Sequence, residues 1–144
     1  MQLDIISGAR KHVVKASAQV PINARQAFEM FCREDLASKF RDIRKYTKWE
    51  VNPAGHVHAE YKVMMMPMRM TMYPDANSRT IRFVTRHMAM ESTGTWRVLP
   101  VNDTACVLRL DQRVHTKLPL PVSMLQSKIE RIFQDVASYA AEIK

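Results

Sequence analysis

The chain has 144 residues, of which 47% are hydrophobic and 25% are charged, as is usual for one globular domain. A net charge of +8 favours contact with acidic partners such as an anionic membrane surface. No apolar run approaches the ~20 residues that a membrane-spanning helix needs, and two cysteines, Cys32 and Cys106, are too few for a disulfide framework or a zinc site. We therefore expect a single domain over residues 1–144, intracellular and either soluble or peripherally membrane-associated, with no cofactor or metal.

The N-terminal part of the chain predicts one strand followed by two short helices. Apolar and polar residues alternate from His12 to Ile22, which indicates a half-buried strand. Asn23, with Gln26 three residues later, is typical of a helix N-terminus, and helical spacing continues to about Cys32. A second short helix is predicted from near Asp35, and its outer face is basic, with Lys39, Arg41, Arg44 and Lys45. We expect these four residues to meet an anionic membrane surface, if the protein docks on one.

The middle of the chain is a series of alternating segments separated by turn residues. A short strand around Trp49 ends at the turn signal of residues 52–55. Further alternating segments cover Val57 to Tyr73, residues 81–98 and residues 106–114. Strands that follow one another through short turns, with no helix between them, indicate an antiparallel meander.

The C-terminal segment changes to a helical period. From about Val122 the apolar residues recur at a spacing of 3.6 and form one stripe that ends near Ile143. Outside this stripe lie Gln126, Lys128, Glu130, Arg131 and Glu142. A helix of this length must bury its apolar side. The apolar face of the meander is the only large partner that the sequence offers for it.

This order of elements resembles the helix-grip fold of the START-like superfamily, which includes polyketide cyclases and the coenzyme Q-binding family. Four segments carry the resemblance: the strand-proline-cap-helix segment of residues 18–28, residues 43–49, the "G-x-W" strand of residues 91–98, and Pro119-Leu120-Pro121 before the last helix. Residues 43–49 lack the proline that this family has there. The resemblance implies an α+β domain whose antiparallel sheet of about six to seven strands wraps a long C-terminal helix, with two short helices after the first strand.

The resemblance also implies an elongated cavity between sheet and helix that accepts a lipid, isoprenoid, polyketide or other apolar molecule. Six of the eleven methionines lie at positions 64, 65, 66, 68, 70 and 72, and methionine adapts to differently shaped apolar partners. We expect Pro67 to mark a turn or bulge within this run. The predicted ligand-binding residues are Tyr61, Val63, Met65, Met68, Met70, Met72, Phe83, Met90, Trp96, Leu108, Leu110, Leu125, Ile129 and Phe133.

Alternatives remain open for several of these features. The methionines could fill core without a ligand, or supply thioether ligands to a Cu(I) site joined by His56, His58 and His87. Arg69 could hold a carboxylate or phosphate head group if its side chain faced the cavity, but alternation favours the solvent face. The helix-grip resemblance implies a position near the cavity mouth for His115, which makes it a candidate general base. The leading function is binding, with transport or presentation, of a lipid, isoprenoid or quinone. The alternatives are a cyclase or dehydratase using the same cavity and a ligand-free interaction module; nucleic-acid binding is not favoured.

Overall fold

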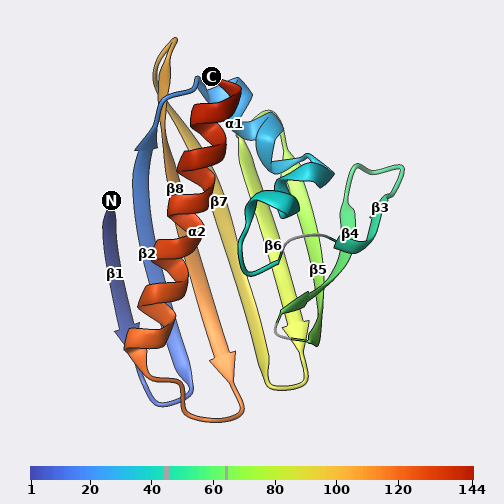
Figure 1. The fold of residues 1–144 in the computed structure, drawn as a ribbon, viewed down its shortest axis with the longest axis vertical. Helices are drawn as coiled ribbons and strands as arrows, with labels where there is room; N and C mark the ends of the chain where they lie inside the picture. Colours follow the sequence, from blue (N-terminus) through green and yellow to red (C-terminus); the bar gives the residue numbers. More distant parts are fainter. Residues whose placement is uncertain (44–45, 64) are drawn as a thin grey trace.

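The computed structural model describes residues 1–43, 46–63 and 65–144 and has the predicted α+β helix-grip architecture (Figure 1). One antiparallel sheet has the strand order β1-β2-β8-β7-β6-β5-β4-β3, and the long helix α2 crosses its concave face. The elements are β1 (Gln2–Ser7), β2 (Lys11–Val20), α1 (Ala24–Phe31), the 3-10 helix η1 (Glu34–Lys39), β3 (Tyr46–Val51), β4 (Val57–Val63), β5 (Met66–Asp75), β6 (Thr80–His87), β7 (Met90–Asn102), β8 (Ala105–Thr116) and α2 (Val122–Ile143).

The sheet has eight strands, slightly more than predicted, because the N-terminal residues form an additional edge strand. β1 pairs with β2 in the register Leu3↔Ala16 and Ile5↔Val14. Only these two apolar residues of β1 face the core side. Two alternating positions make a weak sequence signal, so the strand was missed.

The connection between β2 and β3 contains the two predicted short helices. Asn23 caps α1: its Oδ1 accepts a hydrogen bond from the backbone N–H of Gln26 at 2.9 Å, and Gln26 Oε1 accepts one from the Asn23 N–H at 3.2 Å. Such a capping box stabilises a helix by about 1 kcal/mol. The second helix, η1, is a 3-10 helix of six residues, shorter than the amphipathic pattern suggested.

The methionine run forms the hairpin of β4 and β5, with Tyr61 paired to Met68 and Lys62 paired to Pro67. The prediction that Pro67 marks a turn or bulge is wrong: Pro67 lies inside β5, and the register with β4 is unbroken there. It is tolerated there because β5 pairs with β6 only from Arg69 onward, so the missing N–H removes no bond on that side. Met65 lies in the turn with φ of 70° and is 83% exposed, which contradicts the prediction that it faces the cavity. Met64 lies outside the described residues.

The sheet is much wider than the helix that it grips. Eight strands at a spacing of about 4.8 Å span ~34 Å, whereas a helix with its side chains is about 10 Å wide. α2 lies over β1, β2 and η1, and its buried side chains Leu125, Ile129 and Phe133 join the core. The concave face of β4 to β7 is therefore left for other residues to cover. Within the described residues, no helix has the length and hydropathy to cross a membrane.

Candidate functional site: a cavity between sheet and helix

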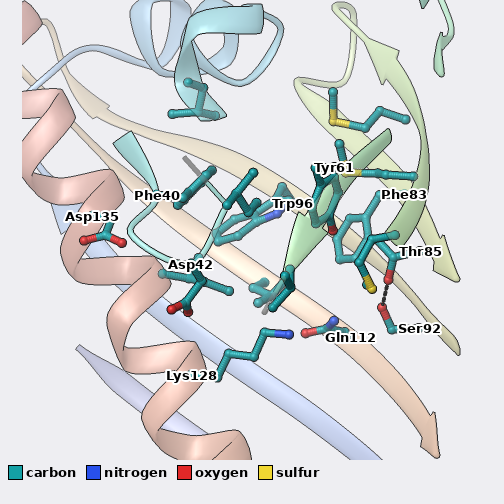
Figure 2. A pocket seen from close by; sticks show the side chains of 18 of the residues that line it. Phe40, Asp42, Tyr61, Phe83, Thr85, Ser92, Trp96, Gln112, Lys128 and Asp135 are labelled. Carbon is teal, nitrogen blue, oxygen red and sulfur yellow. Dashed lines mark hydrogen bonds between the residues drawn. The ribbon is translucent and has the colours of Figure 1, made fainter. Parts of the chain in front are cut away.

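A cavity of about 150 Å³ lies where α2 does not cover the sheet. Its walls come from β3 to β8, from α2, and from the segment of η1 and residues 40–43 (Figure 2). The lining residues are Phe31, Leu36, Phe40, Asp42, Ile43, Tyr46, Tyr61, Val63, Met68, Met70, Met72, Phe83, Thr85, Met90, Ser92, Trp96, Leu110, Gln112, Lys128, Ile132 and Asp135.

Nine of the predicted ligand-binding residues surround this one cavity. Because side chains alternate across a strand, one face of β5 presents three methionines and the adjacent face of β4 presents an aromatic and a valine. The nine are Tyr61, Val63, Met68, Met70, Met72, Phe83, Met90, Trp96 and Leu110. That they contact a ligand remains a prediction.

The other predicted residues lie elsewhere. Leu108, Leu125, Ile129 and Phe133 are at most 4% exposed and belong to the core between sheet and helix, outside the cavity lining. Leu108 lies on β8, and the other three lie on the face of α2 that packs against the sheet, where side chains fill the space. Met65 is in the β4–β5 turn, as described above.

Trp96 points inward, as its parity in β7 predicts, and closes one end of the cavity. Its ring lies 4.8 Å from that of Phe31 and 5.3 Å from that of Phe133, measured between centroids. Tilted aromatic pairs at such distances contribute about 0.5–1.5 kcal/mol beyond area burial. Trp96 therefore packs against both α1 and α2 and connects them to β7.

The wall of the cavity opposite Trp96 contains polar groups among apolar side chains. The hydroxyls of Thr85 on β6 and Ser92 on β7 hydrogen-bond to one another, and both residues are buried. Tyr46 and Tyr61 meet edge to face at 5.9 Å. Burial raises the pKa of Tyr61 to about 12 and also raises the pKa of Tyr46, so both phenols stay neutral and can donate hydrogen bonds at physiological pH.

The polar residues of the lining were not predicted as site residues, apart from Tyr61; they are Asp42, Tyr46, Thr85, Ser92, Gln112, Lys128 and Asp135. In β8, Gln112 alternates in step with Leu110 and Val114, and this pattern in the sequence could have placed it on the inner face. Lys128 was placed on the outer side of the C-terminal helix, but it is half-buried and lines the cavity. Burial lowers the pKa of Lys128; the charge of Asp42 opposes this effect and that of Arg131 adds to it.

Ion pairs to α2 hold the segment that covers the cavity. Arg41 donates to Asp135 at 2.9 Å, and Arg131 on α2 pairs with Asp42 at 3.3 Å. Lys39 pairs with Glu142 at 2.8 Å. Of the four basic residues predicted to meet an anionic membrane, Lys39 and Arg41 are therefore engaged with α2, while Arg44 and Lys45 lie outside the described residues.

The structure also locates the alternative metal and catalytic candidates. In the described part of the chain, no group of three or more His, Cys, Asp and Glu side chains is placed to hold a metal ion. His56 stacks edge to face on Tyr73 at 4.7 Å, and His58 hydrogen-bonds to Thr71. His115 is exposed on β8 and does not line the cavity, because its parity is opposite to that of Val114.

Comparison of the fold finds the same architecture in solved structures of low sequence identity. A START superfamily protein from Mycobacterium smegmatis has a TM-score of 0.73 at 12% identity, covering 92% of this chain and 99% of that one. The ZhuI aromatase/cyclase from Streptomyces sp. R1128 has 0.74 at 15% identity, covering 91% and 94%. Norcoclaurine synthase from Thalictrum flavum, solved with dopamine and hydroxybenzaldehyde, has 0.60 at 14% identity, covering 100% and 99%. No family model and no curated protein matches the sequence.

Proposed function

We propose that this START-like helix-grip domain binds an apolar small molecule of the lipid, isoprenoid or quinone kind and carries it within an intracellular compartment. The observation that supports the proposal is the cavity itself, whose lining is predominantly methionine, aromatic and aliphatic and includes a few polar groups. Ligand pockets in proteins have this composition. Flexible thioethers on β5 suit a wall that must adjust to its ligand.

The volume of the cavity limits the size of the ligand. A cavity of about 150 Å³ holds a molecule the size of a single ring, as benzene-binding apolar cavities of similar volume do. A ring-sized compound fits as the structure stands. A longer chain requires rotation of the methionine side chains or movement of the segment of residues 40–43.

Native mass spectrometry of protein purified without denaturant tests the binding function. We expect a co-purifying apolar molecule, or uptake of an added quinone or isoprenoid alcohol at a stoichiometry of one. The matched variant Met70→Lys/Met72→Lys, which places charge on the cavity wall, should lose uptake. If the wild-type protein carries nothing and takes up nothing, the proposal fails.

Presentation of the ligand at an anionic membrane forms the second part of the proposal. The net charge of +8 supports it, and the exposed residues Lys15, Arg82 and Arg113 on the convex face of the sheet are better placed for it than Lys39 and Arg41. Co-sedimentation with phosphatidylserine vesicles should fall in the Lys15→Ser/Arg82→Ser/Arg113→Ser variant. Equal sedimentation of both proteins contradicts this part alone.

A cyclase-like or dehydratase-like enzyme is the second candidate, and Lys128 is the observation that favours it. A lysine that lines an apolar cavity and has a lowered pKa is suited to moving a proton. The ring-sized probe 5-nitrobenzisoxazole reports proton abstraction by its ring opening. Faster opening by the wild type than by Lys128→Met supports this function, and equal rates contradict it.

A further inference from the structure

Some of the charged residues that line the cavity have ion-pair partners and one does not. The lining contains three of them, Asp42, Asp135 and Lys128. Both carboxylates have arginine partners, Arg131 at 3.3 Å and Arg41 at 2.9 Å. In the ranges that the structure describes, no carboxylate lies within 4.0 Å of the Lys128 ammonium. The cavity therefore has one cationic group whose charge is not balanced by an ion pair.

The position of Lys128 directs this charge toward the ligand space. Figure 2 shows its side chain extending from α2 across the base of the cavity, with the nitrogen toward Gln112 of β8. The Gln112 amide offers N–H donors at the same end. The hydroxyls of Thr85 and Ser92 bond to each other. The rings of Phe40, Trp96 and Tyr61 lie on the side of the cavity away from Gln112 (Figure 2), so a ligand whose polar group meets Lys128 has aromatic surface beyond that group.

A half-buried ammonium in such a setting favours an anionic ligand. Removing an ammonium from water is costly unless an opposite charge or several acceptors replace the water. A neutral ligand leaves this cost uncompensated, whereas a carboxylate makes a charge-assisted hydrogen bond to the ammonium and accepts a second from the amide.

We infer that the ligand of this cavity is a monocarboxylate with a compact, ring-sized apolar body, whose carboxylate is bound by Lys128 and Gln112 and whose ring lies against Trp96 and the methionines of β5. This inference rests on the proposed binding of an apolar small molecule and narrows the ligand of that site from neutral isoprenoids and quinones to compact acids. Specificity comes from the ammonium, and the volume of the cavity limits the size of the apolar body.

Isothermal titration with two matched probes tests the inference. The probes are 3-phenylpropionate and 3-phenylpropan-1-ol, which share the ring and chain and differ in the charged group. We expect the Kd of the acid to be at least about tenfold lower than that of the alcohol, as a charge-assisted hydrogen bond implies. Lys128→Met should remove this preference while leaving the affinity for the alcohol within about twofold. Lys62→Met, an exposed lysine on the outer face of β4, serves as the matched control and should behave as the wild type.

The two probes separate failure of the inference from failure of the proposed function. Equal affinities for acid and alcohol, or an acid preference that survives in Lys128→Met, overturns the inference and leaves apolar binding in place. Failure of the wild-type protein to bind either probe overturns both. Retained binding of the alcohol by Lys128→Met shows that the variant is folded.

Discussion

At the scale of single residues, Gly94 sets a tight limit on the cavity wall. It lies in β7 between Phe83 of β6 and Gln112 of β8. A Cβ at this position would come within 2.6 Å of Phe83 Cζ and 2.7 Å of the backbone oxygen of Asp111. Since such separations are shorter than real contacts, either the ring or the strand must move, and Phe83 lines the cavity.

The Gly94→Ala substitution should therefore reduce both stability and binding. We expect a loss of roughly 1–3 kcal/mol in the free energy of unfolding, as overpacking commonly causes, measured by urea denaturation. Affinity for 3-phenylpropan-1-ol should fall as well, because Phe83 is displaced into the ligand space. Thr95→Ala, on the opposite face of the same strand, is the control. Wild-type stability in Gly94→Ala would contradict the close approach seen here.

Lys128 makes binding of an acid depend on pH. Asp42 from the covering segment, Arg131 from α2 and His87 from β6 are the charged or titratable groups near it. Burial, with the charge of Lys128 as a smaller cause, lowers the pKa of His87, so this residue is neutral above about pH 7. Lys128 binds a carboxylate only while it is protonated, and its pKa is lowered.

Affinity for 3-phenylpropionate should accordingly be highest where Lys128 is protonated and fall as the pH rises through the lowered pKa of Lys128. The alcohol should show no such fall, and neither should the acid with Lys128→Met. Titration calorimetry from about pH 7 to about pH 10 measures this. An acid affinity that is constant over this range contradicts the role of the ammonium.

The sequence correctly predicted which side chains face inward where apolar and polar residues alternate regularly along a strand. Met68, Met70, Met72 and Trp96 were placed on the inner face by alternation alone, and they line the cavity. Lys128 was missed because it falls outside the apolar stripe of its helix, and Gln112 was not assigned to either face of its strand. Only the tertiary arrangement shows that the side of α2 with Lys128 and the inner face of β8 with Gln112 border a cavity.

At the scale of elements, the segment that follows η1 depends on α2 for its position. Asp135 is central to this contact: its carboxylate accepts hydrogen bonds from the Arg41 side chain at 2.9 Å and from the Arg41 backbone N–H at 3.1 Å. Its side chain is 13% exposed, compared with 58% for Glu142 in the neighbouring pair with Lys39. Buried charge-assisted bonds contribute more than exposed ion pairs.

The Asp135→Ala substitution should loosen the cover of the cavity. We expect a loss of roughly 1–3 kcal/mol in the free energy of unfolding and faster dissociation of 3-phenylpropan-1-ol, measured by urea denaturation and by NMR exchange spectroscopy. Glu142→Ala, which breaks the exposed pair, should cost under about 1 kcal/mol and leave dissociation unchanged. Equal effects of the two substitutions would argue against a holding role for Asp135.

Element types were largely predictable because the hydrophobic period changes clearly along the chain. The period of two in residues 12–22 and the period of 3.6 after Val122 correspond to β2 and α2. The predictions that failed concern a short strand and a single residue. β1 has only Leu3 and Ile5 facing the core side, and Pro67 was assigned to a turn because the incomplete pairing of β5 with β6 cannot be read from sequence.

At the scale of the whole molecule, the cavity follows from a mismatch of widths. A sheet of eight strands cannot be covered by one helix, so its β4 to β7 half is closed by η1, by residues 40–43 and by large flexible side chains. The sequence predicted the grip and its apolar wall. It did not predict the cavity's size or its charged end, because both depend on where α2 crosses the sheet.

The central claim is that a ligand occupies this cavity, and the distribution of the methionines allows a direct measurement. Met68, Met70, Met72 and Met90 line the cavity, whereas Met1, Met65, Met88 and Met124 are between 57% and 83% exposed and lie outside it. With ¹³C-methyl-methionine protein, a titration with 3-phenylpropan-1-ol should shift the first four methyl resonances and leave the second four in place. Shifts confined to the exposed methionines, or no shift at all, would contradict the account.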